Sequence, residues 1–185
     1  MDKLKRIKLL AMDVDGVLTD GSMIFGPTGD IKVFHVLDGL GIDLAMRAGL
    51  RIAWITGNTS AAVAERARSL GVTELYQGQR DKSAALRGIA ERNSVALEEV
   101  AYIGDDLNDL PALEAAGAAF AVANAAPEVR AAADFVTERS GGRGAVREAI
   151  EMILKAQGYW DDGIRAFLDM LREQQEKGEA PGAVT

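Results

Sequence analysis

The chain of 185 residues has no cysteine and only one histidine. Without a thiol it can form no disulfide, hold no iron–sulfur cluster and use no thiolate nucleophile. The same absence excludes a zinc finger, and a single histidine excludes a metal site with two imidazole ligands. These gaps argue against a small secreted scaffold held together by disulfides.

An excess of positive charge and long apolar runs are also missing. Lys and Arg number 21 against 28 Asp and Glu, and the net charge of −7 is unsuited to binding a nucleic-acid backbone. No window approaches the ~20 apolar residues of a membrane span. The N-terminus is basic and then apolar, like a signal peptide, but Asp13 and Asp15 interrupt it. We therefore expect a cytoplasmic protein with no nucleic-acid or membrane partner.

Short apolar runs alternate with helical patterns along most of the chain, which is typical of βαβ units. Most of the runs are apolar throughout, as expected of buried parallel strands. This pattern predicts an α/β fold with a Rossmann-like, doubly wound parallel sheet. The predicted strands are residues 7–12, 51–55, 74–76, 100–103, 118–122 and 134–136. The predicted helices are residues 39–48, 60–70, 82–92, 109–116, 128–132, 145–157 and 160–175.

One segment after the first strand breaks this alternation. Residues 22–25 and 31–35 have strand patterns on either side of a turn sequence from Gly26 to Gly29. We predict an inserted β-hairpin at about residues 22–35. The length suits one domain, which we place at residues 1–176, and residues 177–185 have the composition of a flexible tail.

Chemically active side chains follow the predicted strands. Because the carboxyl ends of parallel strands share one edge of a sheet, these side chains should converge there. They are Asp13 and Asp15 after the first strand, Thr56 and Gly57 after the second, Lys82 after the third, and Asp105, Asp106 and Asp109 after the fourth. So many carboxylates repel one another unless a cation lies among them, and hard oxygen ligands favour Mg²⁺. The sequence therefore predicts a magnesium ion.

The same edge suits the transfer of a phosphoryl group. Mg²⁺, Lys82, the Thr56 hydroxyl and backbone N–H groups would neutralise the phosphate. Asp13 would attack in line and form an aspartyl-phosphate, while Asp15 would protonate the leaving oxygen and then activate water.

Four motifs in this order resemble those of the haloacid dehalogenase superfamily phosphatases: DVDGVLTD, ITGN, the DK of RDKS, and GDDLNDLP. Within that superfamily, the hairpin, the segment DGLGI, LYQG and GGRGAVRE are similar to the 3-deoxy-D-manno-octulosonate 8-phosphate phosphatases. This resemblance covers residues 9–157. It implies a capless subunit, Mg²⁺ dependence, a homotetramer in which four hairpins meet, and hydrolysis of an acidic sugar phosphate in lipopolysaccharide precursor synthesis.

The resemblance also implies a role for each matching residue. Asp13 is expected to be the nucleophile and Asp15 the acid/base. Asp13, the backbone carbonyl of Asp15 and Asp105 are expected to bind Mg²⁺. Thr56, Gly57 and Lys82 would hold phosphate, and Asp109 would brace the site. The expected substrate contacts are His35, Asp38, Gly39, Asn58, Arg66, Asp106 and Arg143, and Asp106 is an alternative partner for Lys82.

Two departures bear on the sugar. The octulosonate phosphatases commonly have a basic residue where this chain has Asn58, and often another where it has Asp43. Without these charges a different acid sugar becomes an alternative, such as a nonulosonate 9-phosphate. A non-catalytic phosphosugar-binding module or a receiver-type signalling domain is a further alternative. The motif order argues against the receiver, because Thr56 and Lys82 precede the GDD motif here, and intact Asp13 and Asp15 argue against a non-catalytic module.

Overall fold

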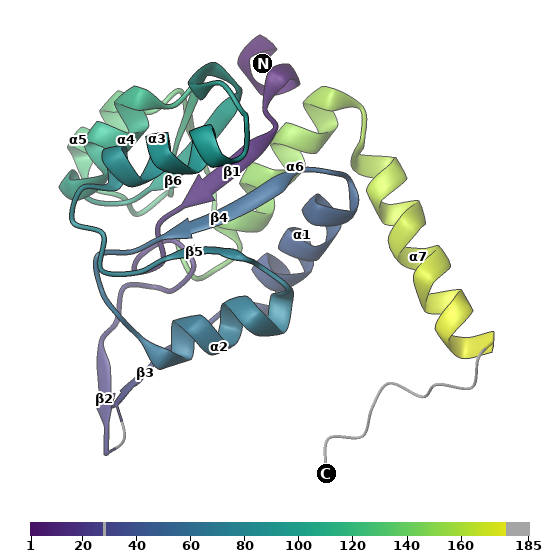
Figure 1. The fold of residues 1–185 in the computed structure, drawn as a ribbon, viewed down its shortest axis with the longest axis horizontal. Coiled ribbons are helices and arrows are strands. Elements are labelled where there is room, and N and C mark those ends of the chain that lie inside the picture. The colour runs from purple at the N-terminus through teal and green to yellow at the C-terminus, as the bar shows by residue number, and fades with distance from the viewer. Residues whose placement is uncertain (28, 177–185) are drawn as a thin grey trace.

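A six-stranded parallel sheet forms the centre of the computed structural model, which describes residues 1–27 and 29–176 (Figure 1). Its order is β5-β4-β1-β6-β7-β8. The strands are β1 (Leu9–Met12), β4 (Arg51–Ile55), β5 (Glu74–Tyr76), β6 (Val100–Gly104), β7 (Ala118–Ala121) and β8 (Phe135–Val136). The predicted α/β class and parallel sheet are confirmed. The predicted tail at 177–185 lies outside the described residues.

Helices cover both faces of the sheet, as a doubly wound fold requires (Figure 1). One face carries α1 (Val36–Arg47), α2 (Ala61–Leu70) and α6 (Ala145–Gln157). The other carries α3 (Lys82–Arg92), α4 (Leu110–Ala115) and α5 (Pro127–Ala132). The last helix, α7 (Trp160–Glu176), packs its first turns on α1 and then extends away from the body.

One continuous apolar core lies between these layers. Every residue of β1 and β7 is buried, and Trp54 and Tyr102 are among its largest fully buried side chains. In the described part of the chain, no helix is both long enough and apolar enough to cross a membrane.

The chain reverses direction across the sheet at β1. From β1 it runs outward through β4 and β5, and then returns to the other side of β1 to form β6. Met12, the last residue of β1, pairs with Trp54 on one side and Ile103 on the other. At such a switch point the loops separate and leave a crevice at the carboxyl ends of the strands, where open α/β sheets bind ligands.

Between β1 and α1, the described residues form the expected hairpin and no separate cap layer. Its strands are β2 (Ile24–Gly26) and β3 (Gly29–Ile31), which pair antiparallel. Both strands are shorter than predicted and extend further into the turn sequence, because Gly26 pairs with Gly29. Residues 32–35 were predicted as strand, but they form no strand and lead into α1.

The N-terminal segment also differs from the expected strand. Asp2–Arg6 form a short 3₁₀ helix, η1, and β1 begins only at Leu9. Two further 3₁₀ turns, η2 (Leu97–Glu99) and η3 (Leu107–Asp109), come before β6 and α4. The side-chain amide of Gln157 in α6 donates to the carbonyls of Leu4 and Ile7, which ties this end of the chain to the body.

Candidate active site

Asp13 lies directly beyond β1 at the centre of the sheet edge. Its backbone N–H donates to the carbonyl of Ile103 at 3.1 Å, so the parallel pairing with β6 continues through this residue. Its side chain is buried, and one carboxylate oxygen, Oδ1, lies 2.8 Å from the Lys82 ammonium. The predicted nucleophile therefore faces the predicted phosphate-binding cation.

Lys82 begins α3 and is almost fully buried. Its Nζ also lies 2.7 Å from Asp109 Oδ1, which accepts a second hydrogen bond from the Tyr102 hydroxyl at 2.7 Å. Burial lowers the pKa of Lys82, but the neighbouring carboxylates outweigh it and the net shift is upward. Lys82 therefore stays charged.

Asp109 is completely buried and braces the loop after β6. Its second oxygen accepts the backbone N–H groups of Asp105 at 2.9 Å and Asp106 at 3.3 Å. Burial raises the pKa of Tyr102 well above its ordinary value, so this phenol keeps its proton and remains a donor to Asp109. These contacts fit the bracing role expected for Asp109.

Three carboxylates form a cluster that suits a cation. One oxygen from each of Asp13, Asp105 and Asp109 lies within 4.8 Å of the others. Asp105 Oδ1 is buried without a hydrogen-bond partner among the described residues. Burial and the other carboxylates raise the pKa of Asp13 to about 6 and that of Asp105 to about 8. A divalent cation relieves this repulsion, and an all-oxygen donor set fits Mg²⁺.

Two glycine-containing loops press closely on this cluster. Gly16 has φ +105°, and a Cβ there would lie 2.0 Å from Asp105 Oδ2. Gly141 packs beneath it, because a Cβ at Gly141 would lie 1.6 Å from the Gly16 carbonyl oxygen. The GGRG sequence therefore supports the loop after β1, and no larger side chain fits at either position.

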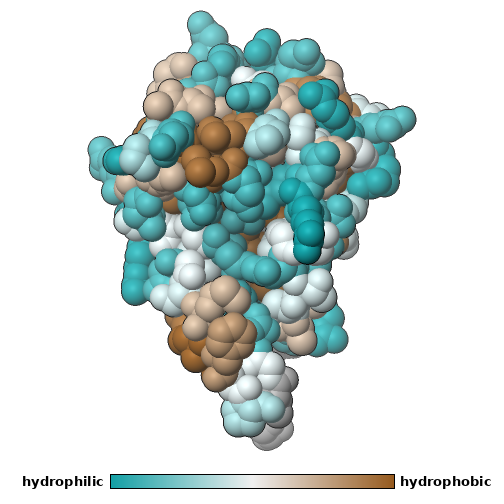
Figure 2. Space-filling view, turned by 90° about the vertical axis from the view of Figure 1, so that its left-hand side faces the viewer, coloured by the Kyte–Doolittle hydropathy of each residue, from teal (hydrophilic) through white to brown (hydrophobic). Residues whose placement is uncertain are grey.

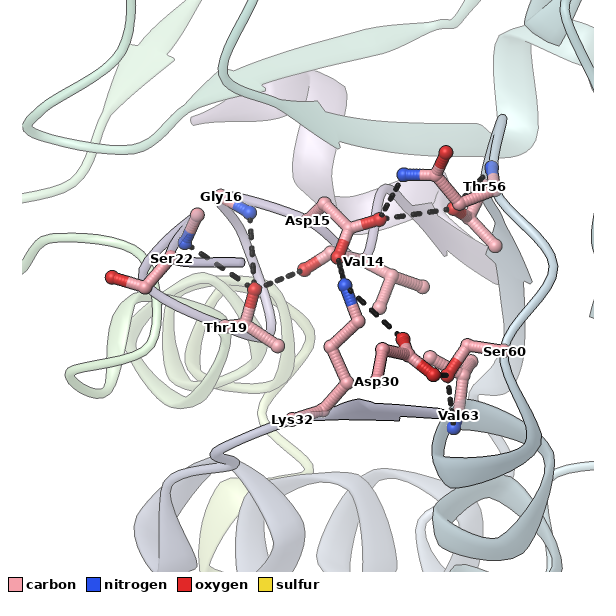
Figure 3. A network of polar contacts seen from close by, with 12 residues as sticks. Val14, Asp15, Gly16, Thr19, Ser22, Asp30, Lys32, Thr56, Ser60 and Val63 are labelled. Atoms are coloured by element: carbon pink, nitrogen blue, oxygen red, sulfur yellow. Dashed lines mark hydrogen bonds and ion pairs between the residues drawn. The ribbon is translucent and has the colours of Figure 1, made fainter. Parts of the chain in front are cut away.

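The Asp15 side chain points toward Lys32 of the hairpin segment and toward Thr56 in the loop after β4 (Figure 3). Its Oδ1 lies 2.5 Å from Lys32 Nζ, while Oδ2 accepts from the Asn58 amide at 2.9 Å and from the Thr56 hydroxyl at 3.4 Å. Burial raises the pKa of Asp15, but the hydrogen bonds from Lys32 and Asn58 outweigh it, and the net shift is downward. Its side chain is absent from the carboxylate cluster, so only its backbone carbonyl is left as its expected metal ligand.

Thr56 and Gly57 end β4 on the same side of the site. Thr56 is buried, and its hydroxyl accepts the backbone N–H of Asn58 at 3.1 Å, which closes a tight turn around Gly57. This places the hydroxyl beside Asp15 and leaves Gly57 exposed, as a residue that offers its backbone to a phosphate must be.

Two of the expected sugar contacts have structural partners instead. His35 is the N-cap of α1, where its Nδ1 accepts the N–H of Leu37 at 3.3 Å. Asp38 is buried, and its carboxylate accepts the N–H groups of Gly144 at 3.2 Å and Arg147 at 2.8 Å. Asp38 thus caps the first turn of α6 from another helix. Burial raises the pKa of Asp38, and the two backbone hydrogen bonds, which favour the ionised form, offset only part of this shift. Their predicted sugar contacts stay predictions.

Gly39 and Arg66 lie together between α1 and α2. Arg66 lies over the Phe34 ring at 5.9 Å, and its Nη2 would be 2.4 Å from a Cβ at Gly39. Both residues, with Asp43, line a cavity of about 320 Å³. No contact among the described residues joins Arg66 to Asp13 or Asp15.

The last two expected contacts lie on exposed loops. The Asp106 carboxylate accepts the N–H of Leu107 at 2.8 Å and caps η3. The ion pairs of Lys82 are with Asp13 and Asp109, and none in the described part of the chain joins it to Asp106, the alternative partner. Arg143 is exposed in the GGRG loop, 3.6 Å from Asp20.

Sequence reasoning missed Lys32 and Tyr102. Lys32 is the only basic residue between the first strand and His35, and it alternates with the apolar Ile31 and Val33. This alternation could have predicted that Lys32 faces the opposite side from them. Tyr102 gave no signal, since a tyrosine within an apolar strand is typical of a core residue.

Magnesium is expected to stabilise the protein more at about pH 8 than at about pH 5. In the folded chain the pKa of Asp13 is raised to about 6 and that of Asp105 to about 8. At pH values between the ordinary carboxyl pKa and these raised values, the folded chain therefore binds more protons than the unfolded chain. Metal-free stability therefore falls as pH rises through this window. Mg²⁺ reverses the loss because it binds the ionised carboxylates. Melting temperatures with Mg²⁺ and with chelator at both pH values test this, and a pH-independent increment would contradict it.

Comparison with known proteins identifies similar chains. The family described as haloacid dehalogenase-like hydrolase matches residues 55–150. The 3-deoxy-D-manno-octulosonate 8-phosphate phosphatase KdsC of Escherichia coli K12 is 46% identical over 161 residues, which cover 86% of each chain.

Solved structures of similar chains share the fold. A 3-deoxy-D-manno-octulosonate 8-phosphate phosphatase from Moraxella catarrhalis, crystallised with magnesium, phosphate and KDO, is 47% identical with a TM-score of 0.86, covering 90% of this chain and 96% of that one. The cobalt-bound phosphatase YrbI of Haemophilus influenzae is 42% identical with a TM-score of 0.84, covering 88% and 98%.

Proposed function

The chain belongs to the haloacid dehalogenase-like hydrolases, and we propose that it is a Mg²⁺-dependent phosphatase that acts on 3-deoxy-D-manno-octulosonate 8-phosphate. The observation that carries this function is the buried contact of Asp13 with Lys82 beside Asp105, at the switch point of the sheet. The chain is 46% identical to KdsC over 88% of its length, and this similarity supports the octulosonate 8-phosphate as the proposed substrate.

In the first chemical step, Asp13 is the nucleophile. The negative charge of a bound phosphate opposes the lowering of the Asp15 pKa by Lys32 and Asn58, and so lets Asp15 hold a proton. A carboxylate oxygen of Asp13 bonds to phosphorus as the bond from phosphorus to the sugar oxygen breaks, and Asp15 donates its proton to that oxygen. Lys82, the Thr56 hydroxyl and the N–H of Gly57 hold the phosphate oxygens. The products of this step are the free sugar and an aspartyl-phosphate at Asp13.

In the second step, water releases the phosphate. Asp15, now ionised, takes a proton from the water as its oxygen bonds to phosphorus, and the bond to the Asp13 oxygen breaks. Inorganic phosphate leaves, Asp13 is again a carboxylate, and Asp15 is again protonated.

Asp13, Asp105 and the Asp15 backbone carbonyl would hold Mg²⁺, with Asp109 bracing them. When bound, Mg²⁺ neutralises charge on the phosphoryl group and on the carboxylates. Lys82 remains beside Asp13 and Asp109, where its charge offsets both carboxylates and its third N–H is left to donate to phosphate.

The sugar is proposed to lie in a cavity of about 380 Å³ between the hairpin and the loop after β4. Its lining includes Met23, Phe25, Lys32 and Asn58. Because Asp15 must reach the leaving oxygen, the sugar lies on the Asp15 side of the phosphate, and Lys32 and Asn58 contact Asp15 directly.

A nonulosonate 9-phosphate is the second candidate substrate, favoured by Asn58. Asn58 carries no positive charge and its amide already donates to Asp15 Oδ2, so it cannot form with a sugar carboxylate the ion pair that a basic residue would form. Asp43 pairs with Arg47 at 2.9 Å and adds no positive charge either.

Phosphate release across a panel of sugar phosphates tests the function. The panel holds the octulosonate 8-phosphate, nonulosonate 9-phosphates and neutral sugar phosphates, each with Mg²⁺ and with chelator. We expect the octulosonate to have the highest kcat/KM and chelator to stop turnover. Preference for a nonulosonate would overturn the substrate alone, whereas no release from any compound would favour the non-catalytic module.

An assembly of four subunits is proposed from the hairpin surface. The exposed apolar residues there are Met23, Ile24, Phe25, Ile31 and Val33. Figure 2 shows a brown and tan patch low on the face of the molecule that carries the hairpin. Apolar patches of this kind on soluble proteins mark interaction sites, and hairpins that meet at a common axis would bury them.

Replacing Phe25 with Glu is expected to dissociate this assembly. Phe25 is 77% exposed in the single chain, so the substitution costs the subunit fold little but places a charge in the proposed contact. Sedimentation velocity should show a tetramer for the wild type and smaller species for Phe25→Glu. A matched exposed substitution on α7, Leu168→Glu, serves as the control. A wild-type monomer at micromolar concentration would contradict the proposal.

A role in lipopolysaccharide synthesis and a place in the cytoplasm stay predictions.

A further inference from the structure

Lys32 is a buried cation on an otherwise exposed segment. Its side chain is 1% exposed, whereas its neighbours Ile31 and Val33 are 51% and 61% exposed. In an extended chain, successive side chains point to opposite sides. The apolar neighbours therefore face outward. Figure 3 shows the Lys32 ammonium beside the Asp15 carboxylate.

The Lys32 ammonium lies between two carboxylates from different parts of the chain. It is 2.5 Å from Asp15 Oδ1 and 3.7 Å from Asp30 Oδ2. Asp30 also accepts a hydrogen bond from the Ser60 hydroxyl at 3.0 Å, and Ser60 is the N-cap of α2. The position of the ammonium is thus set by the hairpin and, through Asp30, by the start of α2.

The two oxygens of Asp15 have different surroundings. Oδ1 contacts Lys32, and Oδ2 contacts the Thr56 hydroxyl and the Asn58 amide. Thr56 is a proposed phosphate ligand, so Oδ2 is the oxygen on the phosphate side. Lys32 on Oδ1 fixes the rotation of the carboxylate and thereby keeps Oδ2 directed at the reacting group.

An ion pair that only anchored the hairpin would need no contact with Asp15. Asp30 lies in the hairpin itself and could neutralise Lys32, yet the closer contact is with Asp15. Burying a lysine costs desolvation free energy even where the ammonium is paired. A lysine that only anchored a surface hairpin could stay exposed and avoid this cost.

We propose that Lys32 is a positioning residue that orients the Asp15 carboxylate for proton transfer to the sugar oxygen. The inference rests on the proposed phosphatase function. It also means that the hairpin contributes to turnover within its own subunit, besides offering its apolar side to other subunits.

The test compares two substrates that differ in their need for an acid. A sugar oxygen leaves with a proton from Asp15, whereas p-nitrophenolate is a stable anion that leaves without one. We expect Lys32→Met to lower kcat/KM by about 10- to 100-fold for an ulosonate phosphate and by less than about 3-fold for p-nitrophenyl phosphate. Lys32→Arg, which keeps the charge, should recover part of the first loss and leave the second value unchanged.

Lys8→Met is the control, because the exposed Lys8 pairs with Glu99 at 2.6 Å, beyond the amino end of β1 and so at the opposite edge of the sheet. Its kinetics with both substrates should equal the wild type. Equal losses for Lys32→Met with both substrates, or no loss with either, would overturn the inference while the active wild type upholds the function. A wild type that hydrolyses no ulosonate phosphate would overturn the proposed function and this inference with it. Melting temperature and sedimentation of Lys32→Arg check that a loss does not come from unfolding or dissociation.

Discussion

The Asp13→Asn variant is expected to release phosphate at least about 10³-fold more slowly than the wild type while it stays folded. An amide of nearly the same shape cannot form the aspartyl-phosphate. The substitution leaves no cavity, although Asp13 is only 4% exposed. Phosphate release with saturating Mg²⁺ measures the loss, and circular dichroism reports the fold.

Stability gives this variant a second, independent readout. Burial and the Asp109 charge raise the pKa of Asp13 to about 6, so at about pH 8 its ionised form opposes folding in the metal-free chain. Asp13→Asn should therefore melt at or above the wild-type temperature in chelator, and should gain less from Mg²⁺. The same substitution at an exposed position on α7, Asp162→Asn, should change neither property. Phosphate release near the wild-type rate by Asp13→Asn would rule out Asp13 as the nucleophile.

The Lys82→Met variant is expected to lose both activity and stability. Lys82 is 2% exposed, and its ammonium is held between Asp13 and Asp109 at 2.8 and 2.7 Å. A methionine fills much of the same space but leaves the buried carboxylates without their cation. Breaking a buried ion pair in this way typically costs about 3–5 kcal/mol of unfolding free energy. Turnover should fall as well, since the phosphate loses a positively charged ligand.

Magnesium should offset part of this instability, because it restores positive charge among the same carboxylates. Denaturant unfolding of Lys82→Met with chelator and with Mg²⁺ measures both effects. The control is Lys155→Met, which removes an exposed ion pair with Glu151 at 2.7 Å and should cost less than about 1 kcal/mol. If Lys82→Met unfolded at the wild-type denaturant concentration in chelator, the buried charge network would not carry the stability assigned to it.

Local patterns predicted most of the sheet. Residues 51–55 and 74–76 were predicted as strands with the bounds later found for β4 and β5, because short, mostly apolar runs between polar turns are characteristic of buried parallel strands. The first turn of α1 was missed. Its N-cap is His35, which is not among the usual capping residues, and it contains Gly39, which disfavours a helix in isolation.

Packing explains why that glycine lies within a helix. A Cβ at Gly39 would meet Arg66 Nη2 at 2.4 Å, so the guanidinium from α2 occupies the space that a side chain on α1 would otherwise fill. The hairpin was placed correctly but its strands were misjudged. Residues 32–35 alternate like a strand, yet Lys32 turns toward Asp15 and the chain enters α1. Both errors come from contacts between residues far apart in the chain.

The amino-acid sequence by itself determined the fold class and the identity of the groups at the sheet edge. Asp13, Thr56, Lys82 and Asp105 each follow a strand, and parallel strands bring their carboxyl ends together whatever the detailed packing. Only the tertiary structure decided what each group touches. It turned Asp15 toward Lys32 and committed Asp38 to the backbone of α6. Such pairings depend on the relative placement of whole elements, which no local pattern encodes, because side-chain partners form only where packing brings distant segments within hydrogen-bond reach.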